Sequence, residues 1–459
     1  MKDRKLYFRR TMVIGVFIAL FITLFLQVPE ASAVPSYARQ TGFPCKSCHL
    51  MPPELTALGR AFKLNGYTMA GKPTVTSKGT DKQGGLSLLE SFPLSVMVDT
   101  TFSSTKSPQP NTQNGDFQIP QAASLFLAGA WAPHVGSFVQ VTYDSQDDHF
   151  SWDNTDIRYA NSTKLFQKDF AYGITLNNNP TVEDLWNSTP AWGYPWVNSS
   201  SAPTPAAAAV INGTLGQDVA GIGGYGMWNN HLYLAGTIYR SQHIGNSLPN
   251  SGECCTFNIR GVAPYWRVAW QQTSKNNYLE VGSYGMHVKS SPGGITGFDG
   301  IFDSYTDWAV DFQYDRTIPR FRGDVFSLRG TYIRENSSLN ATSNFNEESL
   351  IRHHLNTVQA NAEYHFGDRY SATIGWFHID GTPDPVLYPA DSPVTGSENN
   401  DPRSNGYIAN VSWWPVQNIQ LGFQYTGYLR FNGAGTNYDG FGRAAGANNT
   451  VYLVGRFIF

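Results

Sequence analysis

The sequence predicts a mainly all-β fold: a transmembrane β-barrel of roughly sixteen strands that follows a small helical domain at the N-terminus. Charged residues make up only 15% of the 459 residues, whereas soluble domains contain about 25%. Aromatic residues reach 14%, and there are 44 glycines. After residue 33 no apolar run is long enough for a membrane-spanning helix, and apolar and polar residues alternate over most of the chain. These features together are typical of an exported membrane barrel.

Residues 1–33 have the features of a secretory signal peptide. The basic start consists of Lys2, Arg4, Lys5, Arg9 and Arg10. Residues 11–28 are almost wholly apolar, and Ala31-Ser32-Ala33 is a small-residue cleavage site. An uncleaved membrane anchor is the alternative, because the apolar stretch is close to the ~18-residue minimum for a spanning helix. The cleavage site favours export of a mature chain with two parts, residues 34–83 and residues 84–459.

Residues 45–49 read Cys-Lys-Ser-Cys-His, the attachment motif of c-type haem. Cys45 and Cys48 have the spacing to form thioethers with two vinyl groups of one porphyrin, and His49 can then ligate the iron. A redox C-x-x-C motif is the alternative, but it requires a βαβ context that is not present around these residues. Covalent haem attachment takes place outside the bacterial inner membrane. The export signal and the motif therefore together predict one covalently bound haem c.

The haem motif lies in a small domain with a linker, residues 34–83. Residues 53–64 are predicted to form a short helix, because Pro53 suits a first turn and Leu55, Leu58 and Phe62 share one face. Asn65-Gly66 is suited to end this helix in the left-handed conformation. Residues 72–85 are polar and rich in Gly, Lys and Thr, which is typical of a linker.

From about residue 92 the chain alternates with a period of two. In residues 418–431, for example, Ile419 and Leu421 share one face while Gln420 and Gln424 share the other. We expect about sixteen such strands of about 9–13 residues, long enough to cross a bilayer when tilted. Alternation alone also suits a soluble sandwich, which is the alternative.

The connections between these segments alternate in length. Residues 229–230, 367–368 and 415–417 are tight turns, whereas residues 145–153, 178–217 and 381–404 are among the long polar loops. Outer-membrane barrels have short periplasmic turns and long extracellular loops. We therefore expect the outer membrane, extracellular long loops and an N-terminus in the periplasm or in the lumen. A barrel of this size is wide enough for a channel, which a segment of roughly fifty residues can plug.

Residues 35–67 resemble the fused outer-membrane monohaem cytochrome c–porins of iron-oxidising bacteria. The resemblance is carried by the run Pro35-Ser36-Tyr37-Ala38-Arg39-Gln40-Thr41-Gly42 before the haem motif, and by Pro53-Glu54-Leu55, Gly59-Arg60, Phe62-Lys63-Leu64 and Asn65-Gly66-Tyr67. The remainder of the chain resembles this family only in architecture and length. The resemblance implies an Fe(II) oxidoreductase that takes electrons from extracellular Fe²⁺ and passes them through one haem to a periplasmic cytochrome or other carrier.

The resemblance also implies roles for individual residues. Cys45, Cys48 and His49 carry the haem, and Arg39 and Thr41 hold a propionate. For Arg39 and Thr41 the alternative is a turn that only positions the haem motif.

The second axial ligand of the iron has several candidates. Met69 follows the predicted helix and can reach the distal haem face, and a methionine ligand raises the potential. Met51 is too close in sequence to His49 for that role. Met97 and His365 are alternatives, because both are expected on inward faces of strands.

Two further functions stay open. The haem domain can gate or sense solute flow through a porin, or the protein can be a general outer-membrane electron conduit for another donor or acceptor.

The net charge of −3 gives no sign of nucleic-acid binding, and no catalytic triad, phosphate loop or zinc motif occurs. Candidate Fe²⁺-attracting loop carboxylates are Asp147, Asp148, Glu253 and Asp303, for each of which ordinary solvated loop charge is the favoured interpretation. The adjacent Cys254 and Cys255 cannot form an unstrained disulfide, and their role is open.

Overall fold

The computed structural model describes residues 35–72, 74, 92–189, 199–216, 218–241, 258–291, 301–319 and 323–459. The predicted signal peptide, most of the predicted linker, Glu253, Cys254 and Cys255 lie outside these residues. In the described part of the chain, no helix combines the length and the apolar character needed to cross a membrane.

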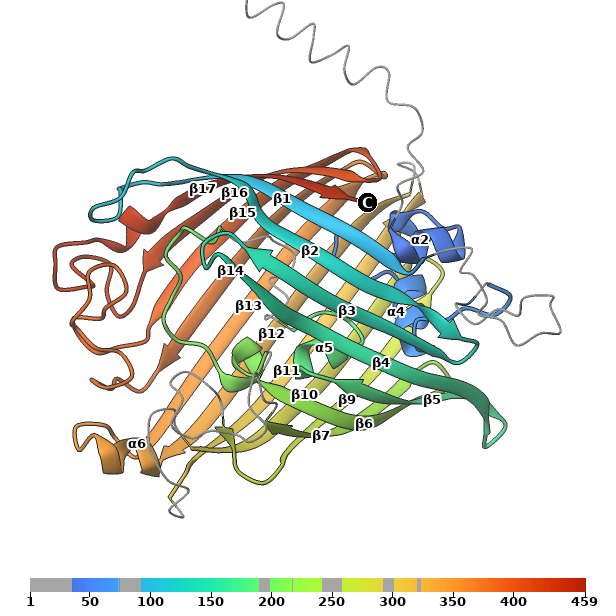
Figure 1. Cartoon of the computed structure of the whole chain (residues 1–459), viewed down its shortest axis with the longest axis horizontal. Helices are drawn as coiled ribbons and strands as arrows, with labels where there is room; N and C mark the ends of the chain where they lie inside the picture. The colour runs from blue at the N-terminus through green and yellow to red at the C-terminus, as the bar shows by residue number, and fades with distance from the viewer. Residues whose placement is uncertain are drawn as a thin grey trace, which may run out of the picture. The chain divides into compact units, whose positions relative to one another are not determined.

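The strands close into one antiparallel barrel (Figure 1). The sheet has 17 strands within the described residues, but β8 (Asn258–Ile259) is a short extension that precedes β9 and pairs with the same neighbour, β10. The wall therefore consists of sixteen long strands. β1 (Leu94–Thr105) closes the ring by pairing with both β2 and β17 (Thr450–Ile458). The predicted barrel of about sixteen strands is confirmed.

The remaining strands follow one another around the wall. They are β2 (Asp116–Ala132), β3 (Val135–Asp144), β4 (His149–Leu165), β5 (Lys168–Asn177), β6 (Val219–Trp228), β7 (Leu232–Ser241), β9 (Ala263–Ser274), β10 (Asn277–Ser291), β11 (Asp303–Ile318), β12 (Asp324–Leu339), β13 (Arg352–Phe366), β14 (Tyr370–Gly381), β15 (Ser404–Val416) and β16 (Ile419–Arg430). Several are longer than expected, and β2 and β4 have 17 residues each. The predicted loop 145–153 is wrong, because β4 already pairs with β3 at His149.

The two faces of the wall have inverted polarity compared with a soluble protein. Along β7, Leu234 and Ile238 are exposed on the outer face, whereas Thr237 and Tyr239 are buried on the inner face. The outer face of the other strands is equally apolar, with exposed residues that include Ile174, Ile222, Val281, Val310, Ile374, Val411 and Phe423. A closed barrel with an apolar exterior satisfies all strand hydrogen bonds in lipid. The wall therefore spans a membrane, and the soluble sandwich is excluded.

Tight turns and long connections alternate along the wall as predicted, except that the connection between β3 and β4 is short, residues 145–148. Asn229 and Asn230 have φ values of 52° and 55°, the left-handed pair that a two-residue hairpin requires. The long connections carry α6 (Asn340–Phe345) and η4 (Ala445–Asn448). In Figure 1, α6 lies near one end of the strands and the N-terminal helices lie at the other end.

The N-terminal segment, residues 35–72, packs against the inner face of the wall. It contains α2 (Ser36–Thr41), α3 (Cys45–Cys48) and α4 (Ala57–Leu64). The Ser36 amide donates to the Ser95 hydroxyl on β1 at 2.9 Å, and the Tyr67 hydroxyl donates to Asp156 on β4 at 2.5 Å. On the far side, the Arg60 guanidinium lies 3.8 Å from the centre of the Tyr278 ring on β10. These contacts join the segment to strands on different parts of the ring.

The helix predicted over residues 53–64 is shorter in the structure and begins at Ala57. Thr56 caps it, because the Thr56 hydroxyl accepts a hydrogen bond from the Gly59 amide at 3.2 Å. Leu55 precedes the helix, and Leu58 is exposed rather than buried with Phe62, so the expected shared face is wrong. Gly66 ends the helix with a φ of 66°, as predicted.

The connection between β5 and β6 folds into the barrel, whereas we predicted a loop outside it. It carries α5 (Pro180–Glu183) and η2 (Val210–Thr214). The backbone amides of Val210 and Ile211 donate to Glu335 and Asp307 of the inner wall, each at 2.7 Å. The apolar core around η2 contains Ala207, Ala209, Val210, Ile211 and Leu215 together with wall residues that include Tyr239, Tyr265, Tyr284 and Met286.

Candidate functional site

The two cysteines of the haem motif lie on one helical turn. Within α3, the Ser47 amide donates to the Pro44 carbonyl and the His49 amide donates to the Cys45 carbonyl, each at 2.9 Å. Cys45 and Cys48 are three positions apart and so project from the same side of the turn. Neither forms a disulfide with a described residue, and both are half-buried.

The His49 ring is oriented by a backbone carbonyl. Its Nδ1 lies 3.1 Å from the Glu54 carbonyl oxygen, which can only accept, so Nδ1 carries the proton and Nε2 keeps its lone pair. Burial lowers the pKa of His49 to about 4, which keeps the imidazole neutral at physiological pH. A neutral imidazole with a fixed tautomer is the form that ligates a metal.

Helix α4 packs against the haem motif backbone to backbone. The Thr56 amide donates to the Cys48 carbonyl at 2.9 Å, and the Thr56 hydroxyl donates to the Ser47 carbonyl at 2.6 Å. A Cβ atom at position 59 would overlap the Cys48 carbonyl oxygen, so this approach requires Gly59. The resulting unit holds the cysteines and the histidine in fixed relative positions.

A cavity of about 570 Å³ lies between the N-terminal segment and the inner wall, within the usual range for cofactor sites of roughly 300–1,000 Å³. Cys45, Cys48 and His49 line it. Its aromatic lining consists of Tyr37, Phe43, Phe62, Tyr67, Phe126, Phe138 and Trp414. Two thiols and a neutral imidazole beside aromatic side chains are donors and neighbours that suit a covalently attached haem.

Arg39 and Thr41 both make contacts with nearby backbone groups. Arg39 donates to the carbonyls of Phe92 and Leu94 and so ties α2 to the start of β1; it does not line the cavity. Thr41 lines the cavity, but its hydroxyl donates to the Tyr37 carbonyl at 2.7 Å and accepts from the Phe43 amide at 3.2 Å. Contact of either residue with a propionate stays a prediction.

The candidate distal ligands lie in different places. Met97 on β1 lines the cavity together with His49. Met69 is half-buried and does not line it. The Met51 sulfur accepts a hydrogen bond from the Ser371 hydroxyl on β14 at 3.5 Å.

A second cavity of about 430 Å³ lies on the other side of His49, which lines both cavities. Its wall includes residues of the tight turns, namely Lys275, Asn276, Gly323, Gly367 and Asp368. His365 also lines it. The haem motif therefore separates an aromatic cavity from a more polar one that opens among the tight turns.

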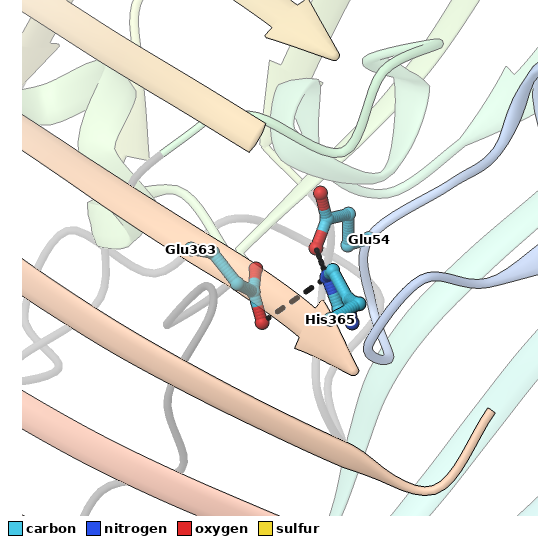
Figure 2. A group of neighbouring side chains, drawn as sticks. All are labelled: Glu54, Glu363 and His365. Carbon is cyan, nitrogen blue, oxygen red and sulfur yellow. Dashed lines mark ion pairs between the residues drawn. The ribbon is translucent and has the colours of Figure 1, made fainter. Parts of the chain in front are cut away.

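One cluster beside this second cavity was missed in the sequence. Glu54 of the N-terminal segment lies with Glu363 and His365 of β13, as Figure 2 shows. Only the inward position of His365 was predicted. Glu54 is more than 300 positions away from its partners, and no local pattern connects them.

The predicted loop carboxylates have structural partners. Asp303 is buried and accepts hydrogen bonds from the Ala341 amide at 2.8 Å and the Thr342 hydroxyl at 2.6 Å, so it caps α6 and is not a solvated loop residue. Asp148 accepts from the Tyr143 hydroxyl at 2.6 Å.

No protein-family model matches the chain, and no curated protein is significantly similar to it. Among solved structures, the chain is similar to OmpT, an outer membrane protein of Vibrio cholerae, at 10% identity over 80% of this chain and 96% of that chain, with a TM-score of 0.41. It is also similar to the outer membrane channel DcaP of Acinetobacter baumannii, at 12% identity over 80% and 96% of the two chains, with a TM-score of 0.44. A third structure is an anion-selective porin from Comamonas acidovorans, at 12% identity over 80% and 98%, with a TM-score of 0.47. At this level of similarity, no activity is transferred to this chain.

Proposed function

We propose that this chain is an outer-membrane cytochrome c–porin that oxidises extracellular Fe(II) and passes the electrons to a periplasmic cytochrome or another carrier. It is then an Fe(II) oxidoreductase with one haem c. The observation that carries the proposal is the position of the C-x-x-C-H turn on the wall of an aromatic cavity inside a closed barrel. The resemblance of residues 35–67 to the cytochrome–porins supports the choice of Fe(II).

Cys45 and Cys48 would hold the haem through thioethers, and His49 would ligate its iron. The bound haem supplies a centre that accepts and donates one electron. The Glu54 carbonyl holds the His49 ring in position, and Gly59 and Thr56 hold the turn that carries the cysteines. The aromatic side chains exclude water from the cavity. Met97, which lines the cavity, and Met69 are the two candidates for the distal ligand.

The N-terminal segment acts as a plug in this proposal. The hydrocarbon layer of about 30 Å is wider than a single haem, so a haem in the periplasm alone is too far from extracellular Fe²⁺. A haem within the lumen shortens the distance to both sides. The connection with α5 and η2 packs an apolar core against the wall, and it also bonds to the N-terminal segment through Lys63 and Asn187. Electrons are then transferred while ferric product remains outside.

A solute porin is the second candidate function. It is favoured by the closed barrel and its buried polar inner face, which includes Thr237, Gln313 and Asn410. In that case the N-terminal segment would gate the lumen. Ion conductance of the intact protein in planar bilayers separates the two: the electron-transfer proposal predicts low conductance, and the porin predicts stable open channels.

The proposal is tested by adding Fe²⁺ to the purified ferric protein under anaerobic conditions. The absorbance of the haem should change to that of the ferrous form, and His49→Ala protein should lack this response. A haem-containing protein that dithionite reduces but Fe²⁺ does not would contradict Fe(II) as the donor.

A further inference from the structure

Three metal-ligating side chains meet where the N-terminal segment touches β13 (Figure 2). Glu363 and His365 are two positions apart on one strand and therefore share its inner face. Glu54 approaches them from the N-terminal segment. The exposed fractions of Glu54, Glu363 and His365 are 2%, 1% and 6%, so the cluster is not a solvated patch.

The spacing of these atoms does not fit direct hydrogen bonds. His365 Nε2 lies 3.4 Å from Glu363 Oε1 and 3.8 Å from Glu54 Oε2, and it has no hydrogen-bond partner among the described residues. A protonated histidine bound to a carboxylate has a separation of about 2.7–2.9 Å. By contrast, ligands at about 2.0–2.2 Å from a tetrahedral metal ion are roughly 3.4 Å apart. The observed distances are those of ligands around an ion.

The Arg329 guanidinium contacts the carboxylates of Glu54 and Glu363 on the side that faces away from His365. Arg329 contacts Glu54 through Oε1, and its Nη1 lies 3.9 Å from Glu363 Oε2. The other oxygen of each carboxylate, Glu54 Oε2 and Glu363 Oε1, is the one directed at His365. Such outer partners are typical of metal ligands, which they hold in place.

The geometry points to a binding site for a divalent transition-metal cation at Glu54, Glu363 and His365. One imidazole and two carboxylates form a donor set for ions such as Zn²⁺ or Fe²⁺, whereas Ca²⁺ and Mg²⁺ prefer oxygen ligands alone. His365 also lines the cavity of about 430 Å³ that opens among the tight turns, which gives an ion a way in.

A cation at this site links the N-terminal segment to the wall. Glu54 binds the ion through its side chain while its carbonyl accepts the His49 Nδ1 proton. The ion thus fixes the residue that orients His49, although it does not itself contact the His49 ring. The site stands on its own residues and does not depend on Fe(II) being the electron donor.

Zn²⁺ binding to the full-length, haem-containing protein tests this site. The protein is freed of metal with a chelator, and bound Zn²⁺ is counted by mass spectrometry and titrated by calorimetry. Wild-type protein should bind one equivalent, and Glu363→Gln and His365→Asn should each weaken that equivalent more than roughly 100-fold. His353→Asn is the matched control, because His353 lies on the same strand but pairs with Asp384. It should retain the wild-type affinity.

Heat-modifiable migration and the haem spectrum show whether each variant has folded. If a folded Glu363→Gln or His365→Asn variant keeps the wild-type affinity, the site is refuted. It is also refuted if wild-type protein binds no Zn²⁺. Neither measurement involves reduction by Fe²⁺, so a failure here is separate from a failure of the proposed function.

Discussion

The two sides of the lumen are filled in different ways. The side from β6 to β14 is packed by the connection that carries α5 and η2, with an apolar core against the wall. A cavity of about 570 Å³ lies among the N-terminal segment, the strands β17 and β1 to β4, and residues of the same connection such as Thr181, Val182 and Gly213. The first side is therefore a structural core. The cavity on the second side has room for a bound ligand or cofactor.

On the packed side, one buried guanidinium faces three buried carboxylates. Arg267 lies 2.7 Å from Asp311, 3.2 Å from Glu280 and 3.8 Å from Asp184 of the inward connection. Buried charges are tolerated when they are paired in this way. The cavity on the other side is lined by the haem motif, by several aromatic residues, and by polar residues that include Gln140, Asp153 and Arg456. The wall near β10 and β11 is therefore occupied by packed side chains, whereas the wall near β1 to β4 borders a cavity that the haem motif also lines.

The largest effect is expected from removing the axial ligand on the cavity side. His49→Ala should abolish the low-spin c-type spectrum while the barrel still folds, because no contact of the packed side involves His49. Absorbance spectroscopy and heat-modifiable migration measure the two outcomes. His353→Ala is the control and should keep its spectrum. A normal spectrum in His49→Ala would overturn the haem assignment.

Deleting residues 34–83 should raise ion conductance in planar bilayers well above that of the intact protein. The deletion removes the material between β1 to β4 and the far wall but leaves the packed side in place. Single-channel recording measures the change. If the shortened barrel conducts no better than the full chain, the N-terminal segment does not plug the lumen.

Gly59→Ala should reduce covalent haem content several-fold. The added methyl group overlaps the Cys48 carbonyl oxygen and must push α4 away from the haem motif, at a cost of about 1–3 kcal/mol. Haem per protein, from a pyridine haemochrome assay, is the measurement. Ala61→Ser is the control, because position 61 lies on the exposed face of the same helix. Equal haem content in both variants would show that this contact is not needed.

The methionines should differ in their effect on the haem. Met97→Ala should lower the potential and open the iron to CO, because Met97 lines the cavity and a thioether ligand favours Fe(II). Met51→Ala should do neither, since its sulfur contacts Ser371. Redox titration and CO binding distinguish them. Loss of the ligand in Met69→Ala instead would support the ligand predicted from the sequence.

The smallest effect is expected from Tyr67→Phe, which removes one hydrogen bond between the N-terminal segment and Asp156. Arg158 and Thr175 still donate to Asp156, so we expect the low end of the range, about 1.5 kcal/mol. Proteolysis of the segment should accelerate about tenfold. Tyr143→Phe, whose hydroxyl bonds to Asp148 far from the segment, should not change this rate. An unchanged rate in Tyr67→Phe would mean that other contacts hold the segment.

The barrel could be predicted from the sequence because its signals are local. Alternation along a strand shows directly which side chains face lipid, and Asn229-Asn230 marks a hairpin by itself. The haem motif is equally local, since five consecutive residues define it. The inward course of residues 178–189 and 199–216 could not be predicted, because Val210, Ile211 and Leu215 follow no regular period. The meeting of Glu54 with Arg329 and His365 depends on barrel register and on packing between distant segments.

We propose that electrons from Fe²⁺ cross the barrel through the haem. The most direct test uses the protein in sealed vesicles, oriented with its long loops outward, with ferric cytochrome c enclosed and Fe²⁺ added outside under anaerobic conditions. Stopped-flow absorbance should show reduction of the protein's haem followed by reduction of the enclosed cytochrome, and His49→Ala vesicles should show neither. Enclosed cytochrome that stays oxidised in intact wild-type vesicles, while dithionite still reduces the protein's haem, would contradict the claim.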